Sequence, residues 1–524
     1  MKNNRIISFF IISLFIVFIS CKNGNNSKVI DLEEITIEDI HNGYKTGTFS
    51  VEQIVNAYID RIKNIDQNGP SLNSIIIVNP DALTIASELD KEILIFGMRG
   101  PMHGIPVILK DNIDTKDKMP TTAGSRILKD SFPLEDSWVA KKLREAGAVI
   151  LGKANLSEWA NYRGSFSSSG WSGLGGQTKN PYVLDRNPCG SSSGSAVAVS
   201  ANLCAVAIGT ETWGSIMCPA NANGIVGIKP TVGLWSRTGI IPISYTQDTA
   251  GPMARNVHDA AILLGAVTGI DQSDNKTINS KNNFFLDYTQ FLNSDGLKGK
   301  RIGYLKTEEG VHFKVDSLIF KAISFMVKSG AEIIELEKIV DGSPSVNSIE
   351  VLAYEFKDGL KKYFDRLGNN SPVESLDEAI QATLADSIEM LHFNLKRMEN
   401  SNSKGDVSSK IYKNALENML EAYRDNGIDK IMDQHNLDAI ISPTGSPAWK
   451  TDLINGDNIK LSSSANAALS GYPNINVPMG FIGDLPVGIS FYGRAWSEPK
   501  LIEIAYAYEQ GTLHRRAPEY LPTD

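Results

Sequence analysis

The chain has 524 residues, and its 51 Lys and Arg against 60 Asp and Glu give a net charge of −9. This acidic balance argues against a general nucleic-acid-binding protein, which would carry a basic surplus. An apolar share of 42% and a charged share of 21% are typical of a globular protein and exclude disordered and collagen-like classes.

The N-terminus is predicted to be a targeting segment. Lys2 and Arg5 precede an apolar run from Ile6 to Ile19. That run is shorter than the ~20 residues of a membrane-spanning helix and has the length of a signal-peptide core. The run ends at Ser20, and Cys21 follows it.

A cysteine in this position resembles the signal of bacterial lipoproteins, although Phe18 stands where that signal usually carries an aliphatic residue. We therefore expect residues 1–21 to direct export, a lipidated Cys21 to anchor the protein to a bacterial membrane, and residues 22–30 to be a polar tether. An uncleaved anchor and an ordinary secretory signal are the alternatives. All three place the folded part outside the cytoplasm.

Helical and strand patterns then alternate along the chain. Helices are predicted within 31–70, where Ser50 and Gln53 form a capping box, and from Ser137 to Ala146. Further predicted helices cover 315–328 and about 498–510. Strands are predicted at 104–109, 148–151, 301–305, 331–336, 437–442, 474–478 and 487–491. Residues 345–436 look helical throughout and are expected to form a cap or subdomain. The alternation predicts an α/β fold with a layered sheet, and residues 31–524 are expected to form one domain.

Two serines are candidate nucleophiles. Gly190 to Gly194 matches the G-x-S-x-G elbow of α/β-hydrolases, which would make Ser192 the nucleophile. That elbow must follow a strand, whereas residues 185–189 form a polar loop. None of the seven histidines stands in a recognisable triad setting. A serine esterase that uses Ser192 and a histidine therefore stays open but is poorly supported.

The second candidate is Ser215, in a turn of small residues that follows the apolar run 204–208. Such a turn can aim several backbone N–H groups at one point, as an oxyanion hole requires. In place of histidine, a lysine can act as the base when burial keeps it neutral. Lys110 follows a predicted buried strand and is the favoured base, with Lys153 and Lys229 as rivals.

Motifs for metals and nucleotides are missing from the sequence. It has no H-E-x-x-H, P-loop or dinucleotide fingerprint, and its four cysteines include no C-x-x-C pair. We therefore expect no metal and no cofactor. Cys189 and Cys218 are interpreted as buried, inert thiols, and Asp111 and Arg186 as an ion pair that orients the loop.

Taken together, the motifs resemble the amidase signature family. The match covers about residues 31–513, and its motifs follow one another in the family's order. They are Gly104–Asn112, Gly190–Ala196, Gly209–Ile216, Ile228–Gly233, Gln247–Pro252 and Gly471–Gly488.

The resemblance implies an α/β/α layered fold with a large mixed central sheet, and a Ser-Ser-Lys triad. The nucleophile falls on Ser215, the bridging serine on Ser191 after a cis Gly190–Ser191 bond, and the base on Lys110. It also places the oxyanion hole and substrate contacts at Thr212, Trp213, Gly214 and Ser215. The implied reaction is hydrolysis of a carboxamide to an acid plus ammonia or an amine, through an acyl-enzyme.

The chain departs from the family pattern at Ser193, Trp213 and Met217, which favours an altered substrate site. The stretch 153–195 looks most like the peptide-amidase branch, which removes the C-terminal carboxamide from peptides. A small-molecule or peptide amide is therefore the expected partner, and no nucleic acid is expected.

Two further hypotheses belong to other classes. The first is the glutamine-handling subunit of a tRNA-dependent amidotransferase, against which the export signal argues. The second is a non-catalytic binding lipoprotein, against which the complete set of triad positions argues.

Overall fold

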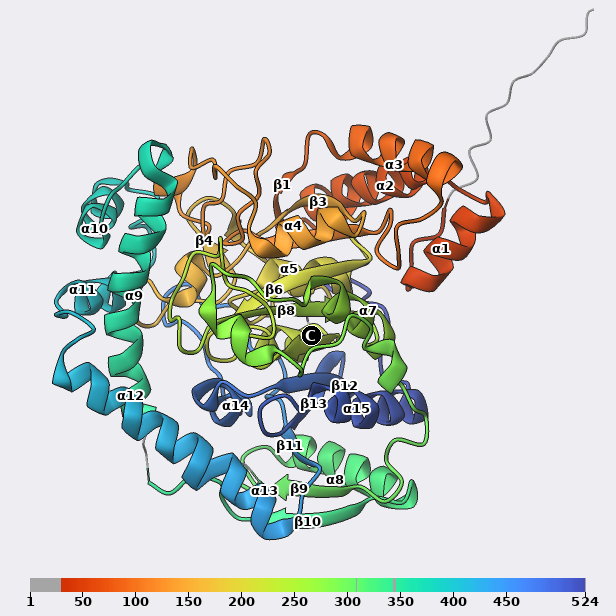
Figure 1. Cartoon of the computed structure of the whole chain (residues 1–524), viewed down its shortest axis with the longest axis vertical. Helices are drawn as coiled ribbons and strands as arrows, with labels where there is room; N and C mark the ends of the chain where they lie inside the picture. Colours follow the sequence, from red (N-terminus) through yellow and green to blue (C-terminus); the bar gives the residue numbers. More distant parts are fainter. Residues whose placement is uncertain (1–29, 308, 343–344, 524) are drawn as a thin grey trace, which may run out of the picture. The chain divides into compact units, whose positions relative to one another are not determined.

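One large mixed sheet runs through the protein (Figure 1). The computed structural model describes residues 30–307, 309–342 and 345–523, and in this part of the chain the sheet has 11 strands in the order β1-β3-β2-β6-β8-β7-β12-β13-β11-β9-β10. The pairs β2–β3, β2–β6, β9–β10 and β9–β11 are parallel, and the other neighbours are antiparallel. The strands are β1 (Ile75–Val78), β2 (Pro106–Lys110), β3 (Val149–Ala154), β6 (Val206–Glu211), β7 (Val226–Lys229), β8 (Thr249–Ala254), β9 (Arg301–Leu305), β10 (Glu332–Leu336), β11 (Ala439–Pro443), β12 (Asn474–Ile482) and β13 (Leu485–Tyr492).

Burial explains the composition of the central strands. Every residue of β2, β3, β6 and β8 is buried. Strands covered on both faces have no solvent side, so they form continuous apolar runs in place of an alternating pattern. The short hairpin of β4 (Trp171–Ser172) and β5 (Gly176–Gln177) lies apart from this sheet.

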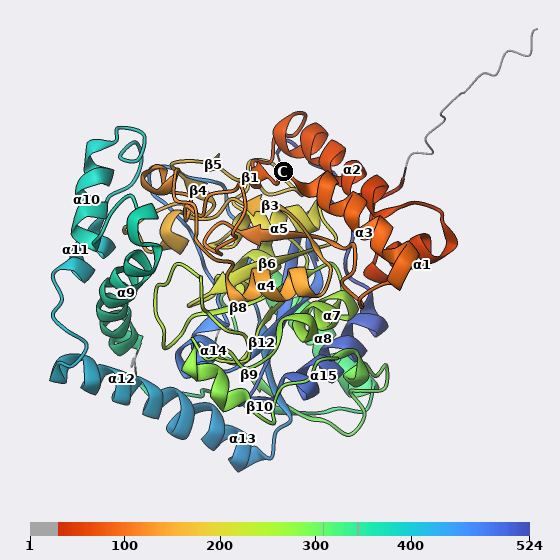
Figure 2. The same ribbon diagram turned by 45° about the horizontal axis from the view of Figure 1, so that its top comes forward.

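Helices flank the sheet in two layers (Figures 1 and 2). Helix α7 contacts both α4 and α15 in one layer, and α5 and α6 contact one another in the other. This arrangement confirms the predicted α/β layered fold. The helices are α1 (Ile37–Thr46), α2 (Val51–Arg61), α3 (Ala82–Phe96), α4 (Trp138–Glu145), α5 (Ser193–Ser200), α6 (Met217–Ala222), α7 (Val257–Val267), α8 (Phe313–Lys328), α14 (Ser464–Ser470) and α15 (Glu498–Thr512).

The stretch 345–436 contains helices and no strand, as its pattern predicts. Its longest helix, α9, contacts α10, α11 and α12, and it packs Leu352 and Phe356 into a core shared with Trp159 and Tyr162. The elements are α9 (Ser345–Leu367), α10 (Leu376–Ala385), α11 (Lys396–Asn402), α12 (Lys410–Tyr423) and α13 (Asp429–His435).

Local sequence signals are confirmed at the helix starts. Ser50 accepts a hydrogen bond from the backbone of Gln53 and completes a capping box, and Ser137 accepts one from the backbone of Ala140. Residues from Leu32 onward form one compact unit. Residues 1–29, which carry the predicted export signal, lie outside the described part of the chain. Within that part, no helix combines the length and apolarity needed to cross a bilayer.

Candidate active site

Lys110 is the last residue of β2, in the interior of the sheet, and its side chain is fully buried. Its Nζ lies 2.7 Å from Ser191 Oγ, 2.9 Å from Thr210 Oγ1 and 3.2 Å from the Thr210 carbonyl. Burial lowers the pKa of Lys110 to about 7, although the Asp248 and Glu211 carboxylates act in the opposite direction. Near neutral pH a substantial fraction of this amine is therefore uncharged and able to accept a proton.

Ser191 stands two residues before the start of α5, and Ser192 between them is the N-cap of that helix. The Gly190–Ser191 peptide bond is cis, as the resemblance implied. The carbonyl of Ser191 accepts a hydrogen bond from the backbone of Ser157 at 3.1 Å. Glycine is required at Gly190, because an added Cβ would lie 2.2 Å from Ser157 Oγ. An added Cβ at Gly194 would lie 2.2 Å from the Ser74 carbonyl oxygen, so glycine in this Gly/Ser-rich stretch allows close backbone packing.

Ser215 stands in the turn between β6 and α6, with 8% of its surface exposed. Its carbonyl accepts a hydrogen bond from the backbone of Ser192 at 3.1 Å, which brings the two serine loops together. Within the described chain, no hydrogen bond joins the backbone N–H of Thr212, Trp213, Gly214 or Ser215 to another protein atom. The turn thus presents unpaired N–H donors beside Ser215, as an oxyanion hole requires.

Glu211 shapes this turn. Its carboxylate accepts the backbone N–H groups of Ile216 at 2.7 Å and Met217 at 2.9 Å, which secures the start of α6. Thr212 Oγ1 donates to Asp248 at 2.5 Å, and Asp248 also accepts the backbone N–H of Ile243 at 2.8 Å. Both carboxylates thereby hold backbone segments around the turn.

A cavity of about 480 Å³ opens beside Ser215. The turn lines it with Thr212, Trp213, Gly214 and Ser215. The helical segment 345–436 supplies another part of the wall, through Ile349 and Leu352 of α9 and Lys396, Arg397 and Asn400 of α11. Trp213 lines the cavity and also packs against the core around Tyr354 and Tyr412, so this side chain belongs to both the wall and the core.

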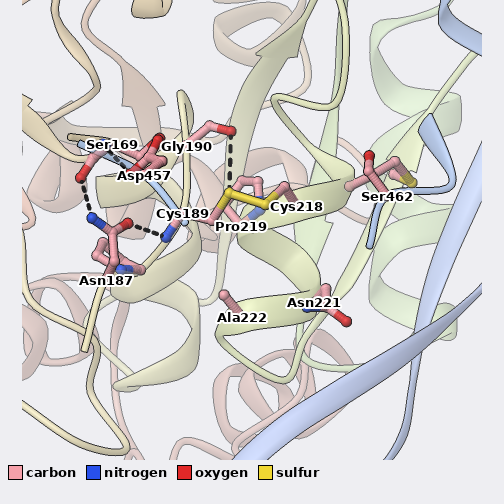
Figure 3. Close-up of a disulfide and its surroundings, with 12 residues drawn as sticks. Ser169, Asn187, Cys189, Gly190, Cys218, Pro219, Asn221, Ala222, Asp457 and Ser462 are labelled. Atoms are coloured by element: carbon pink, nitrogen blue, oxygen red, sulfur yellow. Dashed lines mark hydrogen bonds between the residues drawn. A yellow bond between two sulfur atoms is a disulfide. The ribbon is translucent and has the colours of Figure 1, made fainter. Parts of the chain in front are cut away.

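A disulfide joins the two serine loops (Figure 3). Cys189 and Cys218 are bonded across a sequence separation of 29, and both line the cavity. The interpretation of these residues as inert thiols is therefore wrong. Cys189 precedes Ser191 by two positions and Cys218 follows Ser215 by three, so the crosslink ties together the loops that carry both serines.

The alternative nucleophile, Ser192, and the alternative bases, Lys153 and Lys229, form hydrogen bonds to other parts of the protein. Ser192 Oγ donates to the Thr210 carbonyl at 3.0 Å and accepts the Thr210 N–H at 3.1 Å, and within the described residues no histidine bonds to it. Lys153 donates to the Ile113 carbonyl at 2.7 Å, and Lys229 to the Tyr472 carbonyl at 2.7 Å. These three side chains hold backbone in place and do not approach Ser215 through any hydrogen bond.

The predicted pair of Asp111 and Arg186 is wrong. Asp111 lies 3.8 Å from Lys153 and accepts a hydrogen bond from Thr122, whereas Arg186 faces Asp185 at 3.5 Å. Asp111 directly follows β2, and Lys153 lies in the adjacent strand β3; both side chains are buried. The pairing of Asp111 with Lys153 therefore follows from the order of these two strands.

Sequence reasoning missed several polar residues of the site. Thr210 accepts from both Lys110 and Asn112, the latter at 3.1 Å, and Asp248 faces Lys110 and holds Thr212. The available signal was their place in the sequence. Each lies inside a motif already recognised, at or near the end of a buried strand.

Comparison with known proteins agrees with this geometry. The Amidase family model matches residues 53–502. The chain is 43% identical to a probable amidase of Arabidopsis thaliana over 508 residues, covering 94% of this chain and 93% of that one. It is 33% identical to a glutamyl-tRNA(Gln) amidotransferase subunit of Methanosarcina barkeri, covering 90% and 96%.

Among solved structures, the native peptide amidase from Stenotrophomonas maltophilia is similar with a TM-score of 0.89 and 46% identity, covering 93% of this chain and 99% of that one. The chain belongs to the amidase signature family and is a hydrolase that acts on amide C–N bonds.

Proposed function

We propose that Ser215 is the nucleophile, Ser191 the proton relay and Lys110 the base of this amidase. Neutral Lys110 takes the proton of Ser191, and Ser191 takes that of Ser215 as Ser215 Oγ attacks the amide carbonyl. The N–H groups of the turn 212–215 hold the oxyanion. The proton returns along the relay to the leaving nitrogen, and the C–N bond breaks. Water then attacks the acyl-Ser215 ester and releases the acid.

The contact between Lys110 and Ser191 carries this assignment. A fully buried lysine 2.7 Å from a serine hydroxyl, with its pKa lowered by burial to about 7, is suited to accept a proton near neutral pH. Lys229 is also fully buried with a pKa lowered to about 8, but its Nζ bonds only to backbone carbonyls in the described chain. Lys153 is likewise fully buried with a lowered pKa, but the hydroxyl that it contacts is Thr121 Oγ1, at 2.9 Å. A lowered pKa and contact with Ser191 coincide at Lys110.

For the substrate, we infer a peptide C-terminal amide. The 46% identity to a peptide amidase supports this inference, and it exceeds the 33% identity to the amidotransferase protein. The cavity of about 480 Å³ has room for the end of a peptide.

We expect the chain without residues 1–21 to release ammonia from peptide C-terminal amides at least about tenfold faster than from simple aliphatic or aryl amides. The physical reason is that a peptide contacts more of the cavity wall than a simple amide does, and binding energy gained there can lower the barrier. Initial rates of ammonia release over a matched panel measure this. Faster turnover of the simple amides would leave the mechanism in place and remove the peptide amide as substrate.

We further propose that the protein is exported and anchored to a bacterial membrane through lipidated Cys21. The signal pattern of residues 1–21 supports export, and so does the Cys189–Cys218 disulfide, because disulfides persist in oxidising compartments and are rare in the cytosol.

Cys21→Ser is expected to move the full-length protein out of the detergent-extracted membrane fraction, because a serine cannot carry the thioether-linked lipid. Cell fractionation followed by mass spectrometry of the N-terminal peptide measures both location and lipidation. Cys204→Ala is the matched control, since Cys204 is a buried free cysteine away from the N-terminus. A Cys21→Ser protein that stays in the membrane fraction at the wild-type level would contradict the lipid anchor.

A further inference from the structure

The charged side chains that line the cavity beside Ser215 are positive. Its lining residues include Lys396 and Arg397 but no Asp or Glu. The chain as a whole has a net charge of −9, so the cavity wall is positively charged in a protein that is acidic overall. A cleft lined by one sign of charge concentrates ligands of the opposite sign.

Both cations come from α11. Asn400, on the next turn of the same helix, also lines the cavity, so one face of α11 is turned toward it. Arg397 Nη1 donates to the Asn161 carbonyl at 2.8 Å, which holds the guanidinium at the wall and leaves other N–H donors available. In the described part of the chain, neither Lys396 nor Arg397 forms an ion pair.

The acidic group that acts on Arg397 is already engaged. Asp457 accepts the backbone N–H of Ser169 at 2.9 Å and the Ser169 hydroxyl at 2.5 Å (Figure 3). Burial raises the pKa of Asp457, which disfavours its charged form, whereas Arg397 is exposed. A ligand carboxylate would give the guanidinium the bidentate partner that Asp457 does not supply.

The size of the cavity limits how far such a carboxylate can lie from the reacting amide. A sphere of 480 Å³ is about 10 Å across, the length of roughly three extended residues. The rest of the wall includes apolar side chains, among them Ile243, Ile349 and Leu352. These suit the side chains of a peptide but do not bind a charge.

Building on the peptide-amide function above, we propose that Lys396 and Arg397 form a specificity subsite for a carboxylate on the acyl side of the substrate. The preferred substrate class is then an acidic peptide amide, with Asp or Glu roughly two residues before the residue that carries the carboxamide. Ser215 attacks the amide while α11 holds the acidic side chain.

The test uses three peptide amides that differ only in carrying Glu, Gln or Lys at that position. For the wild-type chain without residues 1–21, we expect kcat/KM for the Glu peptide to exceed that for the Gln peptide about fivefold or more, and the Lys peptide to be slowest. The preference should lie mainly in KM and shrink with added salt, which screens charges near the surface. The Lys396→Gln/Arg397→Gln double variant is expected to bring the Glu-to-Gln ratio within about twofold.

Lys410→Gln is the matched control, because Lys410 is an exposed cation of the same helical segment that does not line the cavity. The Glu-to-Gln ratio is measured within one preparation, so partial misfolding of a variant cancels. Arg397→Lys keeps the charge and should retain part of the preference. Hydrolysis of the Gln peptide with no Glu preference, or with a preference that survives in the double variant, would overturn the subsite alone. Failure to hydrolyse any peptide amide, with simple amides still hydrolysed, would overturn the peptide function and the subsite with it.

Discussion

Ser215→Ala is expected to lower kcat/KM for amide hydrolysis by at least about a thousandfold, because removing a covalent nucleophile leaves only binding and oxyanion stabilisation. Ser215 is the hydroxyl that combines access to the cavity with neighbouring unpaired N–H donors at positions 212–215 of the described turn. Ammonia release under saturating and subsaturating substrate measures the loss, and the variant should still bind the substrate, since the cavity wall is unchanged.

Ser192→Ala separates this prediction from the esterase alternative. Ser192 Oγ is bonded to the backbone of Thr210, so its loss should reduce activity through local packing and by far less than the loss of Ser215 Oγ. The assignment would be reversed if Ser192→Ala were inactive and Ser215→Ala kept near-normal turnover. That result would favour Ser192 as the nucleophile.

Lys110→Ala is also expected to cost about a thousandfold or more, and the wild-type pH profile should identify the same residue. Burial lowers the pKa of Lys110 to about 7, so the ammonium form predominates below that pH and cannot accept a proton. We therefore expect kcat/KM to rise with pH through about 7 and to level off above it. Lys110→Arg should be inactive across this range, because arginine keeps its proton.

Two variants test whether the titration of Lys110 causes the rise of kcat/KM with pH, which is called the pH limb below. The Asp248 carboxylate raises the pKa of Lys110, so Asp248→Asn should move the limb to lower pH. Lys229→Ala should leave the limb in place, because the Lys229 ammonium donates to backbone carbonyls away from Ser191. A limb that disappears in Lys229→Ala but persists in a folded, active Lys110→Ala protein would assign the base to Lys229.

In the helical segment 345–436, the sequence indicates the helices, whereas the tertiary structure determines where they lie. Its helices are encoded by local periodicity, which is why they could be predicted without the fold. Its place beside Ser215 could not, because the wall built from Ile349, Arg397 and Asn400 depends on how α9 and α11 pack. Packing partners far apart in the chain leave no mark on the periodicity of either segment.

The sequence by itself determined the layered α/β class and the caps at Ser50 and Ser137, because each depends on a short stretch with its own pattern. The residues of the proposed triad are a prediction from the sequence motifs. Tertiary structure alone decided the strand order, the Cys189–Cys218 bond and the pairing of Asp111 with Lys153. It also decided that Thr210, Asn112 and Asp248 lie around Lys110 and the turn that carries Ser215. Those contacts arise because the sheet brings together strand ends that are distant in the chain, and strand order and register are properties of the assembled sheet.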